Sequence, residues 1–165
     1  MKHSKITSNY CIRPAQLADI SAALNLFAGE VEAGRMLPRN KENMRAGIQN
    51  WRVASINDEI IGCVSLVFFN QTLCEIRSLA VAEAYRKNGL GKKLIEAALA
   101  LAKVRGAENV LTLTRAPRLF EHFGFQKNDI VKFPEKVQQD CQPCPFISNC
   151  DEVALLYKIK ESGLA

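Results

Sequence analysis

The stretch YRKNGLGKKLIEAALALAKVRGA, Tyr85–Ala107, places two glycines directly before a long amphipathic segment. Gly89 and Gly91 lack a Cβ, so the backbone at these positions is able to approach a ligand closely and to take up a positive φ. The strand-like residues before the two glycines and the helix-like residues after them predict a strand–turn–helix unit. We call residues 86–92 the glycine turn.

The residues after the glycine turn have the spacing of an amphipathic helix. The pattern predicts a helix over residues 90–104 that ends at Gly106, with one apolar face formed by Leu90, Leu94, Ala97, Ala98 and Leu101. The N–H groups and the dipole at a helix start attract an anion, and four cations lie nearby: Arg86, Lys87, Lys92 and Lys93. A phosphate-bearing ligand is one interpretation, and by glycine spacing alone a plain turn is an equally good one.

Two nucleotide-binding motifs do not fit the glycine turn. A dinucleotide fingerprint would need a third glycine where Leu94 stands, and a nucleotide P-loop would need Ser or Thr after the lysine that follows Gly91. Both classes of site are therefore excluded here.

The rest of the chain alternates strand and helix patterns. We expect strands at residues 10–15, a hairpin at 51–69, and strands at 73–81, 109–114 and 153–160; the further expected helices are at 17–34, 40–49 and 117–125. Residues 140–151 form a cysteine- and proline-containing loop, which we call the Cys loop. This order predicts an α/β fold with a mixed sheet in a single domain, residues 1–165, with its core at about residues 10–160.

The composition is that of an ordinary globular protein. With 165 residues, 48% of them apolar and 24% charged, the chain is long enough for one real core. No apolar run reaches the length of a membrane span of about 18 residues, and no secretory signal is visible, so we expect a cytoplasmic protein without membrane partners. The net charge is +5, and the Lys and Arg residues are scattered along the chain without a basic block. This pattern argues against a nucleic-acid partner.

The segment LAVAEAYRKNGLGKKLIEAALALAK resembles the acetyl-CoA-binding motif of the GNAT family of N-acetyltransferases, whose pattern is Gln/Arg-x-x-Gly-x-Gly/Ala. Arg86, Gly89 and Gly91 fill that pattern, and LFEHFGF matches the family segment that ends in Gly-Phe, here Gly124 and Phe125. The resemblance covers almost the whole chain. It implies a single-domain GNAT-like fold: a mixed, mostly antiparallel sheet flanked by helices and splayed at the acetyl-CoA site.

Within the family, the chain is most similar to amino-acid N-acetyltransferases of the N-acetylglutamate synthase type, which act in arginine biosynthesis. The likeness lies in GRMLPRN (Gly34–Asn40), CEIRSLAV (Cys74–Val81), LTLTRAPRLFEHFGF (Leu111–Phe125) and the tail FPEKVQQDCQPCPFISNCDE. Longer members carry an amino-acid-kinase domain, which we do not find in this sequence. The resemblance implies acetylation of the α-amine of L-glutamate by direct transfer, and homodimers are common in the family.

The resemblance also implies roles for individual residues. The pyrophosphate of acetyl-CoA is expected on the backbone N–H groups of the glycine turn: Arg86, Lys87, Asn88, Gly89, Leu90, Gly91 and Lys92. The pantetheine arm is expected to pair with Leu79, Ala80 and Val81, where a backbone N–H near Leu79 or Val81 polarises the thioester carbonyl. Where many members have a tyrosine that protonates the leaving thiolate, this chain has Phe120.

Glu75 is the candidate general base, acting through a water molecule, because it lies on the strand beside the expected reaction site. An equally good interpretation makes it a surface carboxylate or an ion-pair partner of Arg77. For the carboxylates of the acceptor, guanidinium groups are the fitting partners. By position the resemblance favours Arg39 and Arg115, with Arg77 as a further substrate-binding candidate and Arg118 as a weaker one.

The six cysteines divide into two groups. Cys11, Cys63 and Cys74 stand in strand-like runs and are expected to be small buried hydrophobes. Three others, Cys141, Cys144 and Cys150, offer soft ligands for zinc or an iron–sulfur cluster, but structural zinc prefers four ligands. A fourth would have to come from Asp140, Asp151 or His122, so three free thiols are the simpler interpretation.

Other functions stay open from the sequence. The same fold is able to acetylate another amino acid, a polyamine or a protein amine, although a cationic acceptor would call for carboxylates rather than arginines. A non-enzymatic module that binds acetyl-CoA or a metal is the alternative from another class.

Overall fold

The computed structural model of the protein describes residues 9–161, and these form two compact units. The first unit comprises the residues up to Val64 together with Ser78–Ala97. The second unit comprises Ser65–Arg77 together with the residues from Ala98 onward. Seven strands form a sheet in the order β1-β2-β3-β4-β5-β7-β6. The predicted fold class, a mixed and mostly antiparallel α/β sheet with flanking helices, is confirmed.

The strands and helices have the following bounds. The strands are β1 Cys11–Pro14, β2 Trp51–Ile56, β3 Glu59–Phe68, β4 Leu73–Val81, β5 Asn109–Thr114, β6 Gln126–Lys127 and β7 Val153–Lys158. The helices are α1 Ile20–Glu32, α2 Lys41–Ala46, α3 Leu90–Val104, α4 Pro117–Glu121 and α5 Pro134–Lys136, the last continued by a wider turn over Val137–Cys141.

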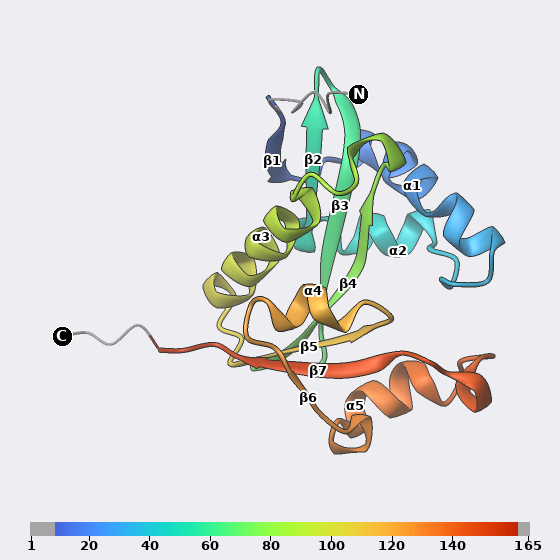
Figure 1. Ribbon diagram of the computed structural model, residues 1–165, viewed down its shortest axis with the longest axis vertical. Helices are drawn as coiled ribbons and strands as arrows, with labels where there is room; N and C mark the ends of the chain where they lie inside the picture. Colours follow the sequence, from blue (N-terminus) through green and yellow to red (C-terminus); the bar gives the residue numbers. More distant parts are fainter. Residues whose placement is uncertain (1–8, 162–165) are drawn as a thin grey trace. The chain divides into compact units, whose positions relative to one another are not determined.

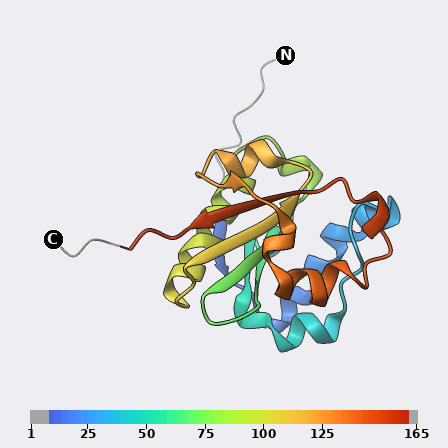
Figure 2. The same cartoon turned by 90° about the horizontal axis from the view of Figure 1, so that it is seen from below.

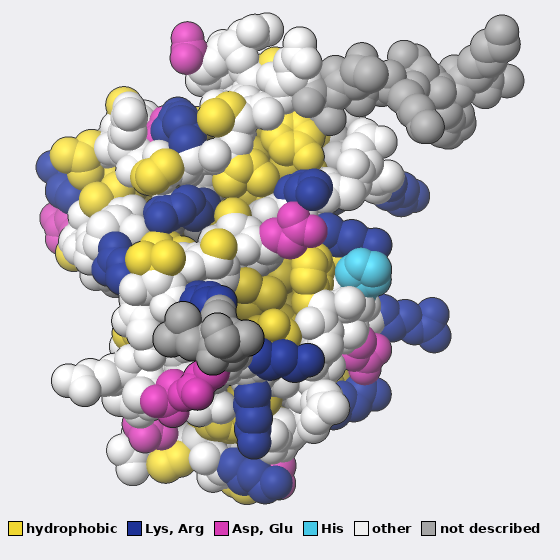
Figure 3. Space-filling view, turned by 90° about the vertical axis from the view of Figure 1, so that its left-hand side faces the viewer, with side chains coloured by type: hydrophobic (Ala, Val, Ile, Leu, Met, Phe, Trp, Pro, Cys, Tyr) yellow, Lys and Arg dark blue, Asp and Glu magenta, His cyan; other side chains and the backbone are white. Residues whose placement is uncertain are grey.

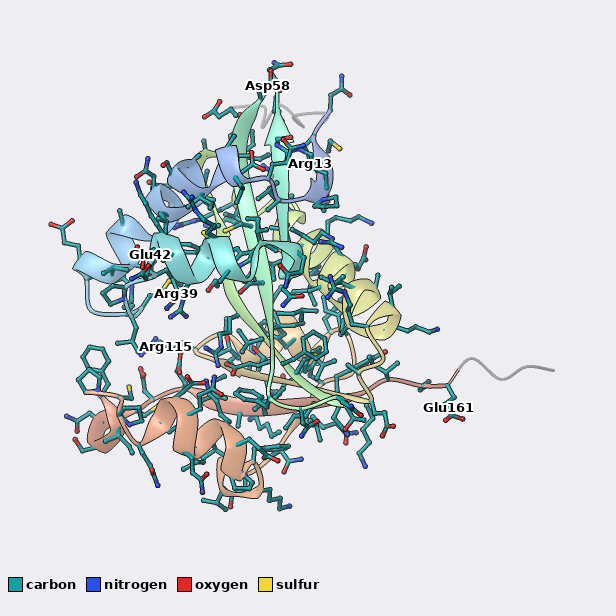
Figure 4. All side chains as sticks on the ribbon, turned by 180° about the vertical axis from the view of Figure 1, so that it is seen from behind. Arg13, Arg39, Glu42, Asp58, Arg115 and Glu161 are labelled. Atoms are coloured by element: carbon teal, nitrogen blue, oxygen red, sulfur yellow. The ribbon has the colours of Figure 1, made fainter. Side chains whose placement is uncertain are left out.

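The first unit is built on the β2–β3 hairpin. Its turn residues Asn57 and Asp58 have φ values of 47° and 66°, a conformation that Asn and Asp tolerate better than other side chains. β1 pairs antiparallel with β2, from Cys11↔Ser55 to Pro14↔Arg52. Helices α1 and α2 cover one face of these strands, while the first turns of α3 lie on the other face (Figures 1 and 4).

The core of the first unit lies under α1 and α2. Its buried apolar side chains are Ile20, Ala23, Phe27, Met44, Trp51, Val53, Ile60 and Cys63. The rings of Phe27 and Trp51 meet edge to face, with their centroids 6.3 Å apart. The Asn40 side chain accepts hydrogen bonds from the N–H groups of Glu42 and Asn43, so it caps α2 as its sequence position predicts.

The second unit is built around β5 and β7. β5 pairs parallel with β4 from Leu73↔Asn109 to Glu75↔Leu111, and antiparallel with β7 from Asn109↔Lys158 to Thr114↔Val153. Helices α4 and α5 lie on opposite sides of β7 (Figures 1 and 2). Leu73, Leu111 and Phe133 form a small buried cluster in this unit. The predicted splay of the sheet at the acetyl-CoA site stays a prediction, as does the single domain.

Two elements are not predicted by the sequence pattern. The two-residue strand β6 is too short to show alternation, and it is held by its antiparallel pairing with β7. The helical run Pro134–Cys141 was expected to be loop, because most of its residues are polar. The predicted strand at 153–160 ends at Lys158, and the predicted helix at 17–34 spans Ile20–Glu32 after a short turn.

Close approach of α3 to β3 depends on Gly62. A Cβ at this position would lie 2.9 Å from Leu94 Cδ1 and 3.2 Å from the Ala80 carbonyl oxygen. We expect Gly62→Ala to lower the free energy of unfolding by about 1–3 kcal/mol, the usual cost of overpacking. Urea denaturation measures this change. Gly29→Ala is the matched control, because nothing lies within 4 Å of that position in α1; equal stabilities of the two variants would contradict the packing role of Gly62.

Candidate active site

The last residues of β4 bend at Ser78, directly before the expected pantetheine strand Leu79–Val81. Ser78 has a φ of 54°, which is uncommon for a residue other than glycine and costs about 1–3 kcal/mol when the surroundings impose it. Those surroundings are visible: Arg39 Nε donates to Ser78 Oγ at 2.9 Å, and the Cys63 thiol faces the Ser78 carbonyl oxygen at 3.6 Å. Arg39 reaches this position from the segment just before α2 (Figure 4).

The glycine turn follows β4 through one short helical turn. Ala82 N–H donates to the Ile61 carbonyl at 2.8 Å, and Arg86 Nε donates to the Val81 carbonyl at 2.9 Å. Lys87 and Gly89 have φ values of 64° and 82°, so the backbone reverses here in the left-handed region. The sequence predicts a positive φ for a glycine such as Gly89, but nothing in it predicts a positive φ for Lys87.

The start of α3 is held by a buried leucine, and there is free space beside its two glycines. Leu90 is buried at the first position of the helix, and Lys93 N–H makes an early helical bond to the Gly89 carbonyl. No atom lies within 4 Å of a Cβ placed on Gly89 or Gly91. N–H groups in a first helical turn have no acceptor within their own helix. The binding of an anion by the glycine turn stays a prediction.

Glu75 lies in the second unit and is only 3% exposed. Its carboxylate forms ion pairs with Arg77 at 3.0 Å and with Lys136 at 2.9 Å. Asp140 completes the group, since it pairs with Lys136 at 3.2 Å and also contacts Arg77. We call these four residues the buried quartet. The sequence left open whether Glu75 is a base or a partner of Arg77, and the structure shows the ion pair.

The buried quartet balances two positive and two negative charges. Burial acts to lower the pKa of Arg77, but Glu75 and Asp140 outweigh it and raise that pKa above its ordinary value. The Arg77 guanidinium also lies 5.7 Å from the ring centroid of Phe69. Sequence reasoning did not single out Lys136 and considered Asp140 only as a possible metal ligand. Their i, i+4 pairing becomes apparent only once Pro134–Cys141 is known to be helical.

Arg115 follows the end of β5 and meets two carboxylates that precede β7. Its Nε lies 2.8 Å from Asp151 Oδ1, and its Nη1 lies 3.5 Å from Glu152 Oε1. The register Thr114↔Val153 brings these residues together although they are 36 or more positions apart. Burial raises the pKa of Glu152 against the opposing effect of Arg115. The sequence pointed to Arg115, but not to Glu152.

Phe120 lies in the core of the second unit. Its ring is buried and packs edge to face on Phe125, with the centroids 5.4 Å apart. The Phe125 ring also packs at a tilt against the ring of Tyr157, with the centroids 5.2 Å apart. The Gly-Phe segment therefore has a packing role in this unit.

The cysteines of the Cys loop carry free thiols: Cys141 and Cys144 are half-buried and Cys150 is exposed. Within residues 9–161, no three His, Cys, Asp or Glu side chains come close enough to hold a metal ion. The predicted zinc or iron–sulfur site at these cysteines is therefore not supported. Burial raises the pKa of Cys63 and Cys74 to about 12, as expected of buried cysteines, whereas the expectation that Cys11 is buried is wrong, because it is exposed on the edge strand β1.

Charged side chains are dispersed over the face shown in Figure 3. Figure 3 shows Lys and Arg side chains spread across the face around α3, with acidic groups among them rather than in a single basic block. Among the residues that the structure describes, no helix has the length and apolarity needed to span a membrane.

Removing one member of the buried quartet should be far more destabilising than removing an exposed ion-pair partner. We expect Lys136→Ala to lower the free energy of unfolding by about 3 kcal/mol or more, because it leaves Glu75 as an uncompensated buried carboxylate. The control is Lys93→Ala, whose pair with Glu96 is exposed and should contribute no more than about 0.5 kcal/mol. A loss below about 1 kcal/mol for Lys136→Ala in chemical denaturation would contradict the described pairing.

Comparison with known proteins identifies the family to which this fold and glycine turn belong. The acetyltransferase (GNAT) family model matches residues 19–125. An uncharacterized N-acetyltransferase from Chlorobaculum tepidum is 38% identical over 146 residues, which cover 88% of this chain and 94% of that protein. An amino-acid acetyltransferase from Pasteurella multocida is 30% identical over 141 residues, 84% of this chain.

The chain spans only 31% of the Pasteurella enzyme. Among solved structures, the N-acetylglutamate synthase of Neisseria gonorrhoeae, complexed with coenzyme A and N-acetyl-glutamate, matches 93% of this chain and 36% of its own with a TM-score of 0.82 at 23% identity. That likeness shows a shared fold. The family model, the Chlorobaculum relative and the glycine turn together establish that this chain belongs to the GNAT family and is an N-acetyltransferase.

Proposed function

We propose that the protein transfers the acetyl group of acetyl-CoA to the α-amine of an acidic amino acid, with L-glutamate as the favoured acceptor. The observation that carries the proposal is the glycine turn, in which left-handed Lys87 and Gly89 lead into the start of α3 with open space at Gly89 and Gly91. The amino-acid acceptor is supported by the Pasteurella relative, and glutamate by the N-acetyl-glutamate complex of the Neisseria synthase. A role in arginine biosynthesis is part of the same proposal.

The proposed cosubstrate site lies in the first unit. The diphosphate of acetyl-CoA sits on the backbone N–H groups of Arg86–Lys92, where a fixed dipole needs no reorganisation to bind an anion. The pantetheine arm runs along Leu79–Val81, and a backbone N–H at Leu79 donates to the thioester oxygen. Because charge builds on that oxygen in the transition state, a preset donor stabilises it more than the ground state. The Ser78 bend and its bond from Arg39 fix the direction of that donor.

The acceptor carboxylates call for guanidinium groups, and Arg39 and Arg115 are each a candidate partner. Arg77 is a weaker candidate, since its ion pairs to Glu75 and Asp140 already engage its guanidinium in the buried quartet. The amine attacks the thioester directly. Phe120 has no proton to donate and is buried, so the departing thiolate takes its proton from water or from the reacting nitrogen.

Glu75 stays a candidate for the base, acting through water, although it is contacted by two cations and almost fully buried. A cationic acceptor, such as a polyamine, is the second candidate substrate class. The observation that favours it is the pair of carboxylates, Asp151 and Glu152, beside Arg115.

The acceptor class is tested by thiol release with purified protein, acetyl-CoA, the twenty amino acids and a set of polyamines. We expect release that depends on glutamate, with aspartate the nearest competitor. Release with polyamines alone would overturn the acidic acceptor in favour of the second class. No release with any amine would contradict the enzymatic proposal as a whole.

The cosubstrate site is tested by Gly89→Asn. Asn tolerates the left-handed conformation at a cost of about 1 kcal/mol, but its side chain would occupy the open space proposed for the diphosphate. We expect the Kd for acetyl-CoA in calorimetry to rise at least about tenfold, equivalent to about 1.4 kcal/mol. Gly106→Asn is the matched control, since Gly106 has a φ of 86° and no atom within 4 Å of an added Cβ. Equal affinities of the two variants would remove the glycine turn from the site.

A further inference from the structure

A buried thiol on β3 contacts the backbone at the end of β4, within the first unit. Cys63 is fully buried, and its Sγ lies 3.6 Å from the Ser78 carbonyl oxygen, to which the thiol donates. The Ala80 N–H bonds to the same sulfur, but burial dominates and raises the pKa of Cys63 to about 12. The thiol therefore keeps its proton at neutral pH and remains a donor to Ser78.

This contact fixes the direction of the next backbone N–H. A trans peptide group is planar, so its carbonyl and its N–H point to opposite sides. The Ser78 carbonyl and the Leu79 N–H belong to one such group. Because the carbonyl points to Cys63 on β3, the Leu79 N–H points away from β3. A pantetheine arm that pairs with Leu79–Val81 must lie on that side, since β3 takes the other edge of β4.

The residues after Leu79 keep the same arrangement. The Ala82 N–H donates to the Ile61 carbonyl of β3 at 2.8 Å. The Val81 carbonyl, which shares a peptide group with that N–H, therefore points away from β3, and it accepts a hydrogen bond from Arg86 Nε at 2.9 Å. The direction inferred for the Leu79 N–H thus agrees with two independent hydrogen bonds.

Arg39 holds the same serine through its side chain. Ser78 is buried with a φ of 54°, a conformation that serine, unlike glycine, adopts only under constraint. Arg39 Nε donates to its Oγ at 2.9 Å. The hydroxyl and the carbonyl of Ser78 are each engaged by a side chain, the first by Arg39 and the second by Cys63. A return of Ser78 to negative φ would turn the peptide group that carries the Leu79 N–H.

We propose that Arg39 and Cys63 are positioning residues, which hold Ser78 in its left-handed conformation and so direct the Leu79 N–H at the thioester oxygen of acetyl-CoA. This inference rests on the proposed function and gives Arg39 a role other than binding the acceptor. In this role neither side chain touches a substrate. Both act through Ser78 on the one donor that stabilises charge on the thioester oxygen.

The direct readout is the infrared band of the thioester carbonyl in bound acetyl-CoA that carries ¹³C at this carbon, measured without an acceptor. A hydrogen bond from the Leu79 N–H weakens the C=O bond and moves its band below the wavenumber of free acetyl-CoA. We expect Arg39→Met, which has no donor, to lose most of this displacement while acetyl-CoA still binds. Arg39→Lys should restore part of it, because an ammonium is able to donate to Ser78 Oγ.

Kinetics separate positioning from acceptor binding. Arg39→Met should lower kcat at least about tenfold with the KM for the acceptor unchanged, because the contact that it supports is made in the transition state. An arginine that binds the acceptor equally in both states would raise KM instead.

Ser78→Gly provides the background for a double-mutant cycle. Glycine takes a positive φ readily and has no hydroxyl for Arg39 to hold. In that background Arg39→Met should cause no further loss of kcat, because its effect passes through Ser78. An arginine that binds the acceptor would show the same loss in both backgrounds.

Two further variants complete the set. Arg35→Met is the matched control, since this arginine also lies in the first unit but forms an exposed pair with Glu30. It should leave both the carbonyl band and kcat as in the wild type. Cys63→Ala removes the thiol and should lose part of the band displacement. If Cys63→Ala does not fold, the variants at Arg39 and Ser78 decide the question.

The outcomes distinguish this inference from the proposed function. If the wild type lowers the carbonyl band and Arg39→Met lowers it equally, the inference fails alone. If Arg39→Met raises the KM for the acceptor and leaves kcat unchanged, Arg39 binds the acceptor and the inference fails again. If the wild type does not bind acetyl-CoA, or binds it without any displacement of the band, the proposed cosubstrate site itself fails.

Discussion

Left-handed backbone at the end of β4 and in the glycine turn is the constraint on which the proposed cosubstrate site depends. Ser78, Lys87 and Gly89 all have positive φ, and only one of them is glycine. The other two adopt this conformation at a cost, so the surroundings must hold them. The bond from Arg39 to Ser78 Oγ and the contact of Arg86 with the Val81 carbonyl supply part of that support. In the proposed cosubstrate site, the backbone amides of this turn are the preset binding surface for the diphosphate.

Charge in the second unit is arranged in two different ways. The buried quartet is closed and internally balanced, and it ties the helical run Pro134–Cys141 to β4 through Lys136 and Asp140. The Arg115 group, which includes Asp151 and Glu152, is partly exposed to solvent and contains one guanidinium and two carboxylates. The closed group suits stability, because its members satisfy one another, whereas the Arg115 group is accessible to solvent.

Much of the fold was predictable because its signals are local. Helix α3 has a full apolar face, the β2–β3 turn has Asn-Asp, and the glycine turn has a recognisable spacing. The parts that the sequence did not predict depend on contacts between residues far apart in the chain. β6 exists because β7 pairs with it, and Lys136 is buried only because Glu75 lies on β4 to pair with it. Glu152 gave no signal for the same reason, since its neighbour Arg115 comes from the end of another strand. Cys11 was misjudged because an edge strand exposes positions that a central strand would bury.

The central claim, that main-chain amides of the glycine turn bind the diphosphate, is tested most directly by amide NMR. Backbone N–H resonances of the ¹⁵N-labelled protein would be followed during titration with coenzyme A. The largest shifts are predicted for Arg86–Lys92, with smaller ones along Leu79–Val81, because a bound anion polarises the N–H groups that donate to it. Saturable binding that leaves these resonances in place and moves others, such as those of the Cys loop, would contradict the account.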